Sequence, residues 1–143
     1  MKINDKRTFI IAEAGVNHNG SIKKALKLID VAKLSGANAI KFQTFKAENL
    51  TTEYAPKSEY QKYKSLKKET QFQMLKKLEL TEEMHKACLK ECKRKKIIFI
   101  SSAFDIESLD YLKKFKPEVP RSVFEIHRVH SFVLSQMLVI VAT

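Results

Sequence analysis

The feature of this chain that most limits its possible folds is an alternation of short apolar segments with longer segments of helical periodicity. Residues Phe9–Ala12 have the composition of a buried strand, and a helical pattern of apolar residues follows from Ile22 to Gly36. Such alternation is typical of an α/β fold, in which parallel strands are joined by right-handed helical crossovers. The other predicted elements are a strand at 38–43, a polar segment at 44–68, a short helix at 69–78, a helix capped by Thr81, a strand at 97–100 and a helix capped by Asp105.

Polar side chains of the kinds common in active sites lie at the end of each predicted strand. Glu13 follows the first strand, and Lys41 and Gln43 lie at the end of the second. Ser101 and Ser102 follow the third. The carboxyl ends of parallel strands share one edge of a sheet, and α/β proteins bind ligands at that edge. The pattern therefore predicts the N-terminal portion of a (β/α)8 barrel, about three βα units long, with a solvated loop glutamate as the alternative for Glu13.

The formal net charge of +11 makes nucleic acid a candidate partner. The lysines are spread over the predicted helices, however, and the one basic run, Lys93–Lys96, ends a helix whose dipole it complements. Cys88 and Cys92 do not have the usual zinc spacing, and a disulfide between them is not expected in a reducing compartment. The sequence shows no signal peptide and no apolar segment of membrane-spanning length, so we expect a cytoplasmic protein without membrane contact.

Three motifs follow one another along the chain: Ile11-Ala-Glu-Ala-Gly-Val-Asn-His-Asn-Gly20, Ile40-Lys-Phe-Gln-Thr-Phe45 and Phe99-Ile-Ser-Ser-Ala-Phe-Asp105. In order and with natural spacing, they resemble the N-terminal part of the sialic acid synthase family. This family includes N-acetylneuraminate, legionaminic acid and pseudaminic acid synthases. The resemblance spans about residues 8 to 116, which we expect to form a partial barrel domain.

The resemblance implies a reaction in which phosphoenolpyruvate condenses with an N-acetylated hexosamine to give a nine-carbon 2-keto sugar acid and phosphate. Lys41 matches the lysine that holds phosphoenolpyruvate in the family, and Ser102 stands where many members have a threonine near that substrate. Gln43 matches a position that contacts the sugar acceptor. Glu13 matches a catalytic glutamate that lies close to the metal through a water.

The resemblance also implies a divalent metal cofactor, manganese or magnesium, and a homodimer for the intact enzymes. The family's metal-binding histidines lie much later in the chain than His18, so the direct metal ligands are expected to be absent from these residues. Asn17 and His18 match the family's first loop, and we expect them to shape that loop.

Residues 117–143 depart from the family pattern, which continues after the third helix with a strand and a Ser-Gly-Glu motif. All 23 lysines lie at or before Lys116, and no glycine follows Gly36. We expect this atypical tail to come from a shifted reading frame, and a divergent strand around Ser122 to Ile126 is the alternative. We accordingly expect little or no synthase activity from this chain, and a non-catalytic fragment or a basic nucleic-acid-binding protein are the competing interpretations.

Overall fold

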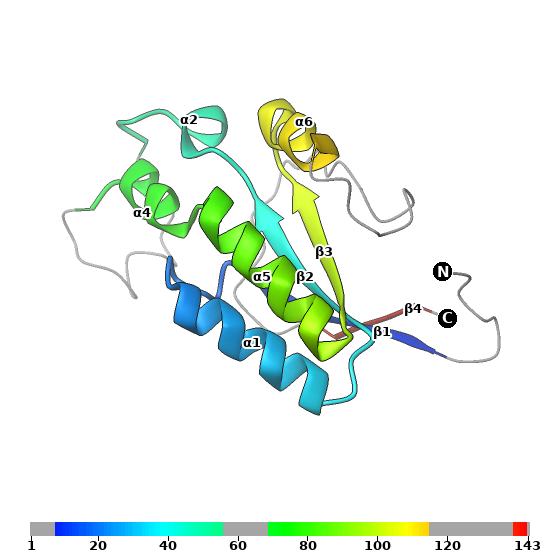
Figure 1. Cartoon of the computed structure of the whole chain (residues 1–143). Coiled ribbons are helices and arrows are strands. Elements are labelled where there is room, and N and C mark those ends of the chain that lie inside the picture. Colours follow the sequence, from blue (N-terminus) through cyan, green and yellow to red (C-terminus); the bar gives the residue numbers. More distant parts are fainter. Residues whose placement is uncertain (1–7, 56–68, 115–138, 143) are drawn as a thin grey trace.

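A four-stranded sheet covered on one face by two helices forms the centre of the molecule (Figure 1). The structure is a computed structural model and describes residues 8–55, 69–114 and 139–142. In chain order the elements are β1 (Phe9–Gly15), α1 (Ile22–Leu34), β2 (Ala39–Thr44), α2 (Ala47–Leu50), α4 (Gln71–Leu78), α5 (Glu82–Lys95), β3 (Ile98–Ala103), α6 (Ile106–Lys114) and β4 (Val139–Ala142).

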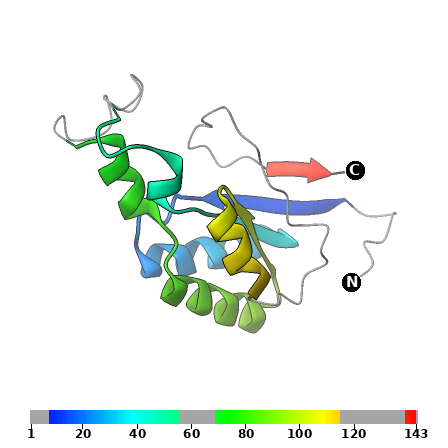
Figure 2. The same cartoon turned by 90° about the horizontal axis from the view of Figure 1, so that it is seen from above.

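The strands lie side by side in the order β3-β2-β1-β4. The strand β1 pairs in parallel with β2, and β2 pairs in parallel with β3, as the alternation of segments predicts. The strand β4 pairs antiparallel with the other edge of β1 (Figure 2). The alternative strand around Ser122 to Ile126 lies outside the described residues, and the division of the chain at residue 117 stays a prediction.

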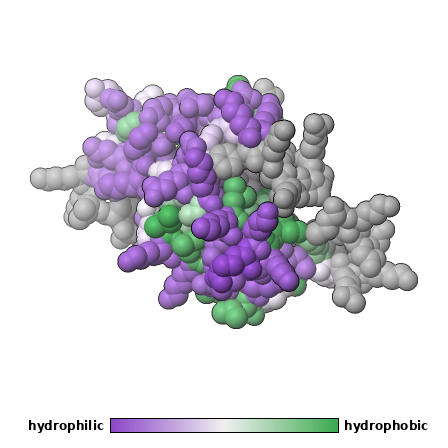
Figure 3. Space-filling view, viewed as in Figure 1, coloured by the Kyte–Doolittle hydropathy of each residue, from purple (hydrophilic) through white to green (hydrophobic). Residues whose placement is uncertain are grey.

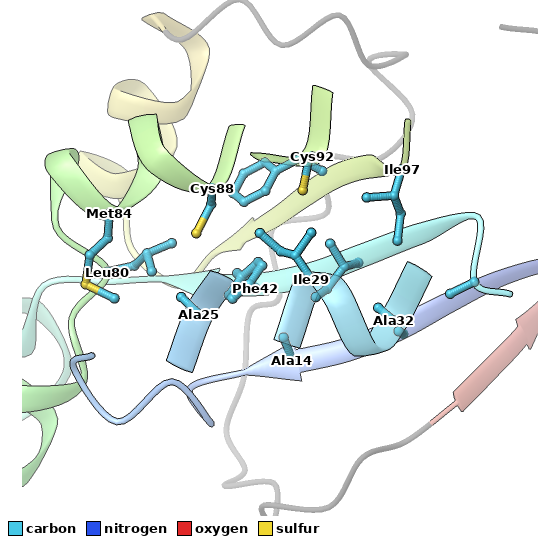
Figure 4. Packing of buried hydrophobic residues seen from close by; sticks show 14 residues of the cluster. Ala14, Ala25, Ile29, Ala32, Phe42, Leu80, Met84, Cys88, Cys92 and Ile97 are labelled. Atoms are coloured by element: carbon cyan, nitrogen blue, oxygen red, sulfur yellow. The ribbon is translucent and has the colours of Figure 1, made fainter. Parts of the chain in front are cut away.

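Helices α1 and α5 pack against each other and cover one face of the sheet (Figures 1 and 2). The layer between these two helices and the sheet is filled by small and medium apolar side chains, so the helices approach the strands closely. Most of the hydrophobic stabilisation of the described fold comes from this layer. Its buried residues are Ala12, Ala14, Ala25, Ile29, Ala32, Ala37, Ile40, Phe42, Leu80, Met84, Cys88, Cys92, Ile97 and Phe99 (Figure 4).

The alternation of side chains along a strand divides the sheet into two faces with different roles. Ala12 on β1, Ile40 on β2 and Phe99 on β3 belong to the layer beneath α1 and α5. Their neighbours Glu13 and Lys41 therefore point to the opposite face. One face of the sheet holds the core, and the other is free to carry polar groups.

The loop after β1 is held against the end of helix α4. Gly20, in this loop, has a left-handed backbone with φ +69°, and a Cβ atom added there would lie 2.5 Å from the carbonyl oxygen of Lys77. Helix α4 is in turn joined to α2, because Lys76 forms an ion pair with Glu48 at 2.6 Å. The loop after β1, helix α4 and helix α2 are thus packed together at the carboxyl edge of the sheet.

We expect Gly20→Ala to destabilise the protein more than Gly36→Ala. Both glycines have positive φ, so a methyl group at either position carries a backbone strain of about 1 kcal/mol. Gly36 has no atom within 4 Å of its added Cβ, whereas Gly20 meets a backbone carbonyl that cannot rotate away. The clash at Gly20 should cost about 1–3 kcal/mol more. Urea unfolding of the two variants measures the difference, and equal losses would show that the loop does not pack against α4.

Candidate active site

Glu13 and Lys41 form an ion pair on the open face of the sheet. They are direct partners in the parallel register of β1 and β2, so their side chains leave the sheet side by side. The Lys41 Nζ atom lies 2.7 Å from Glu13 Oε2, and the side chains are 20% and 16% exposed. A partly buried pair is screened by water less than a surface pair, so the lysine charge is fixed in place.

The second carboxylate oxygen of Glu13 has no hydrogen-bond partner although it is buried. It lies beside Gly15, where the register of β1 against β2 shifts by one residue at an irregularity between Glu13 and Gly15. A Cβ atom added at Gly15 would be 3.5 Å from Glu13 Oε1 and 3.6 Å from Gln43 Nε2. The glycine thus leaves a small gap that an acceptor oxygen and an amide nitrogen both border.

Gln43 and Ser102 form the next row of the same face. They are register partners in the pairing of β2 with β3, and they lie two residues beyond the row that contains Lys41. Ser102 is buried and Gln43 is half-buried. The four residues predicted for substrate and catalysis, Glu13, Lys41, Gln43 and Ser102, therefore share one face near the carboxyl edge of three adjacent strands.

Glu13 and Ser102 lie inside strands, whereas the sequence pattern predicts them just after the strands. The strand β1 continues to Gly15 and β3 continues to Ala103. The cause is backbone pairing with β2, which extends to Thr44 and satisfies the peptide groups of the polar residues on both sides. Strand residues hold their side chains in a fixed direction, which suits a preorganised site better than a loop would.

Asn17 and His18 lie in the loop after β1 and do not join this group. The Asn17 N–H donates to the carbonyl of Ala14 at 2.9 Å, and the Gly20 N–H donates to His18 Nδ1 at 3.1 Å. His18 is fully buried, and its ring centroid lies 6.3 Å from that of Phe42, which belongs to the core layer. The ring therefore packs behind the sheet, away from Lys41. The predicted loop-shaping role is in keeping with these contacts and stays a prediction.

His85, a fully buried histidine on α5, was not among the residues predicted from the sequence. Its Nε2 atom lies 2.9 Å from Thr44 Oγ1, and Thr44 Oγ1 lies 2.6 Å from Ser101 Oγ. A signal was present in the sequence, because His85 precedes the apolar positions Cys88 and Cys92 by three and seven residues. This spacing places the histidine on the buried face of the predicted helix.

No group of three or more histidine, cysteine, aspartate or glutamate side chains within residues 8–55, 69–114 and 139–142 could hold a metal ion. Cys88 and Cys92 are free and buried, and burial raises the pKa of each thiol to about 12. Thiols with such pKa values are poor metal ligands. Glu13 Oε1 is one unpartnered oxygen and does not make a metal site alone. The described residues therefore do not fit a divalent metal by themselves.

Many of the basic side chains are paired with acidic neighbours. The ion pairs on helices include Lys86–Glu82, Lys95–Asp30 and Lys113–Asp110.

The face seen in Figure 3 is covered largely by hydrophilic residues, with hydrophobic residues grouped near its middle. No helix in the described part of the chain is long and apolar enough to cross a membrane.

Comparison with known proteins shows similarity to sugar-acid synthases. The model of the NeuB family matches residues 28–134. The chain is 48% identical over 109 residues to the N,N'-diacetyllegionaminic acid synthase of Campylobacter jejuni, covering 76% of this chain and 33% of that protein. It is 50% identical over 104 residues to the enzyme of the same name from Legionella pneumophila, covering 73% of this chain and 29% of that protein. The chain thus spans about a third of the length of the curated relatives that it matches.

The chain is similar in fold to a crystal structure of the N-acetylneuraminic acid synthetase from Leptospira borgpetersenii. The TM-score is 0.62 at 28% sequence identity, over 82% of this chain and 39% of that chain. The described α/β units are the N-terminal part of a (β/α)8 barrel, which confirms the fold predicted from the sequence.

We expect the protein to lose stability as the pH falls from about 6.5 to about 4. Burial lowers the pKa of His85 from 6.5 to about 4, and burial also lowers the pKa of His18. Between these pH values the unfolded chain binds a proton at His85 that the folded protein does not bind. The stabilisation is thus complete above pH 6.5 and is lost progressively toward pH 4. For His85 the loss should reach about 3 kcal/mol, measured by urea unfolding at a series of pH values.

The variant His85→Gln isolates this contribution, because glutamine cannot take up the proton. Its stability should depend less steeply on pH in the same window, with the remaining slope due to His18 and the carboxyl groups. An unchanged slope would show that His85 is not the titrating group.

Proposed function

The chain belongs to the NeuB family, and from that premise we propose that its strands carry part of the active site of a sialic acid synthase-type enzyme. Such an enzyme condenses phosphoenolpyruvate with an N-acetylated hexosamine to give a nine-carbon 2-keto sugar acid and phosphate. The observation that carries the proposal is the gathering of Glu13, Lys41, Gln43 and Ser102 on one sheet face at the carboxyl edge.

Lys41 would supply the fixed cation that the phosphate or carboxylate of phosphoenolpyruvate needs. Its position on a strand and its contact with Glu13 hold the charge before the substrate arrives, so little reorganisation is required on binding. The Ser102 hydroxyl can donate a hydrogen bond to the same anion, and Gln43, its register partner, can contact the sugar through its amide. The proposal thus places phosphoenolpyruvate across both rows, between Lys41 and Ser102, and the sugar beside Gln43 in the second row.

Glu13 would act after the carbon–carbon bond has formed. In the reaction the enol carbon of phosphoenolpyruvate attacks the aldehyde carbon, and the aldehyde oxygen gains a proton. Water then adds to the cationic C2 atom and phosphate leaves, which generates the keto group. Glu13 Oε1 has no partner in the described structure and could accept the proton of that water.

A divalent metal would supply Lewis-acid polarisation of the aldehyde in such an enzyme. The described residues do not hold one by themselves, so these steps use only side chains of the chain. We also propose that the 143 residues alone bind phosphoenolpyruvate with little or no turnover. The cytoplasmic location and the homodimer stay predictions.

We expect Lys41→Met to weaken phosphoenolpyruvate binding by about tenfold or more, because it removes the cation and keeps the chain length. The control is Lys27→Met, which removes the same charge from an exposed position on α1. Titration calorimetry of the wild type and both variants measures the affinities. Equal affinities for the two variants would reject a role of Lys41 in anion binding.

We expect Glu13→Gln to have the opposite effect on binding. Removing the negative charge 2.7 Å from Lys41 abolishes its repulsion of an incoming anion, so phosphoenolpyruvate affinity should rise about fivefold. In a complete synthase that carries the same motif, the same change should abolish turnover without unfolding the protein. Normal turnover by that enzyme variant would contradict the catalytic role of Glu13.

A further inference from the structure

A buried hydrogen-bond network joins helix α5 to the ends of strands β2 and β3. His85 from α5, Thr44 from β2 and Ser101 from β3 are all buried, and each is within 3 Å of the next through the hydroxyl of Thr44. His85 Nδ1 lies 3.2 Å from the carbonyl oxygen of Thr81. The network therefore begins at the N-terminal turn of the helix and crosses two strands.

The direction of the hydrogen bonds follows from the chemistry of the groups. A carbonyl oxygen only accepts, so the proton of the His85 ring is on Nδ1 and is donated to Thr81. Burial keeps the ring neutral at pH 7 by lowering its pKa to about 4, which leaves Nε2 as an acceptor. Thr44 therefore donates to His85, and Ser101 donates to Thr44. The Ser101 hydroxyl also lies 3.4 Å from the Phe42 carbonyl oxygen, a longer contact that shares the same proton.

The position of the His85 ring is itself fixed by its surroundings. The Thr81 hydroxyl caps α5 by accepting from the Met84 N–H at 3.2 Å, which sets where the helix begins. The ring packs edge-on against Phe99 and Tyr111, with centroid distances of 6.1 Å and 5.2 Å. These contacts hold the ring in place, so its Nε2 atom keeps a fixed position against the Thr44 hydroxyl on β2.

The network lies directly behind two residues of the candidate site. Thr44 follows Gln43 and Ser101 precedes Ser102, so the side chains of each pair leave the sheet on opposite faces. Gln43 and Ser102 are also register partners. A shift of β2 against β3 that broke the bond between Thr44 and Ser101 would therefore displace both site residues.

We propose that His85 is a positioning residue, which acts through Thr44 and Ser101 to hold Gln43 and Ser102 in register at the carboxyl edge. The assignment of Gln43 and Ser102 to substrate rests on the proposed function, whereas their mechanical connection to His85 does not. The residue touches neither substrate nor the reacting atoms in this role.

The test uses Thr44→Val, which has nearly the shape of threonine and removes both hydrogen bonds of the hydroxyl. Thr44→Ser keeps the hydroxyl and serves as the conservative rescue. Ile29→Val, in the core layer beneath the same sheet, is the control for a general loss of stability, because Ile29 is fully buried and lies outside the network. Ser101→Ala replaces Thr44→Val if that variant does not fold.

The first readout is hydrogen exchange of the Phe104 amide in the ligand-free chain, because this N–H donates to the Thr44 carbonyl at 3.0 Å. In Thr44→Val it should exchange about tenfold faster than in the wild type, while amides of β1 stay unchanged. Thr44→Ser should restore the wild-type rate, and Ile29→Val should not speed up Phe104 selectively. Uniform acceleration across the sheet in Thr44→Val would overturn the proposal.

The second readout is the phosphoenolpyruvate affinity of each folded variant. The affinity should fall about fivefold in Thr44→Val and stay near the wild-type value in Thr44→Ser and Ile29→Val. Wild-type affinity in Thr44→Val would overturn the positioning of Ser102 for this ligand. Absence of binding even by the wild type would instead reject the proposed function, and the hydrogen-exchange result would still decide the mechanical connection.

Discussion

The parallel register of β1, β2 and β3 is the constraint on which the described structure depends. It sets Glu13 opposite Lys41 and Gln43 opposite Ser102, so each polar pair lies at the same height on the sheet. The same register brings Thr44 and Ser101 together on the other face. A slip of one residue would exchange the two faces, sending Lys41 into the apolar layer and Phe42 out of it. The fold and the candidate site are therefore specified by one set of backbone hydrogen bonds.

Much of this arrangement could be predicted from the sequence because it follows from two periodicities. Apolar strands separated by helical segments predict parallel pairing, and alternation along a strand places Lys41 and Gln43 on one face. The caps at Thr81 and Asp105 were also predictable, since each side chain accepts a backbone N–H three residues further on. Local chemistry of this kind does not depend on distant parts of the chain.

The parts that could not be predicted depend on contacts between distant segments. The extension of β1 to Gly15 and of β3 to Ala103 requires the pairing with β2, which no local propensity of Glu13 or Ser102 indicates. The contact of His85 with Thr44 joins residues 41 positions apart, and it also requires that β2 continue to Thr44. Helical spacing could place His85 on a buried face but could not name its partner.

The antiparallel strand β4 has a consequence for the way in which this sheet can grow. Residues Val139–Ala142 use the backbone groups along the free edge of β1, from Phe9 to Ala12. In a closed barrel of parallel strands the last strand would pair with that same edge. One row of N–H and C=O groups can serve only one neighbour, so ring closure at β1 and the pairing with β4 exclude each other.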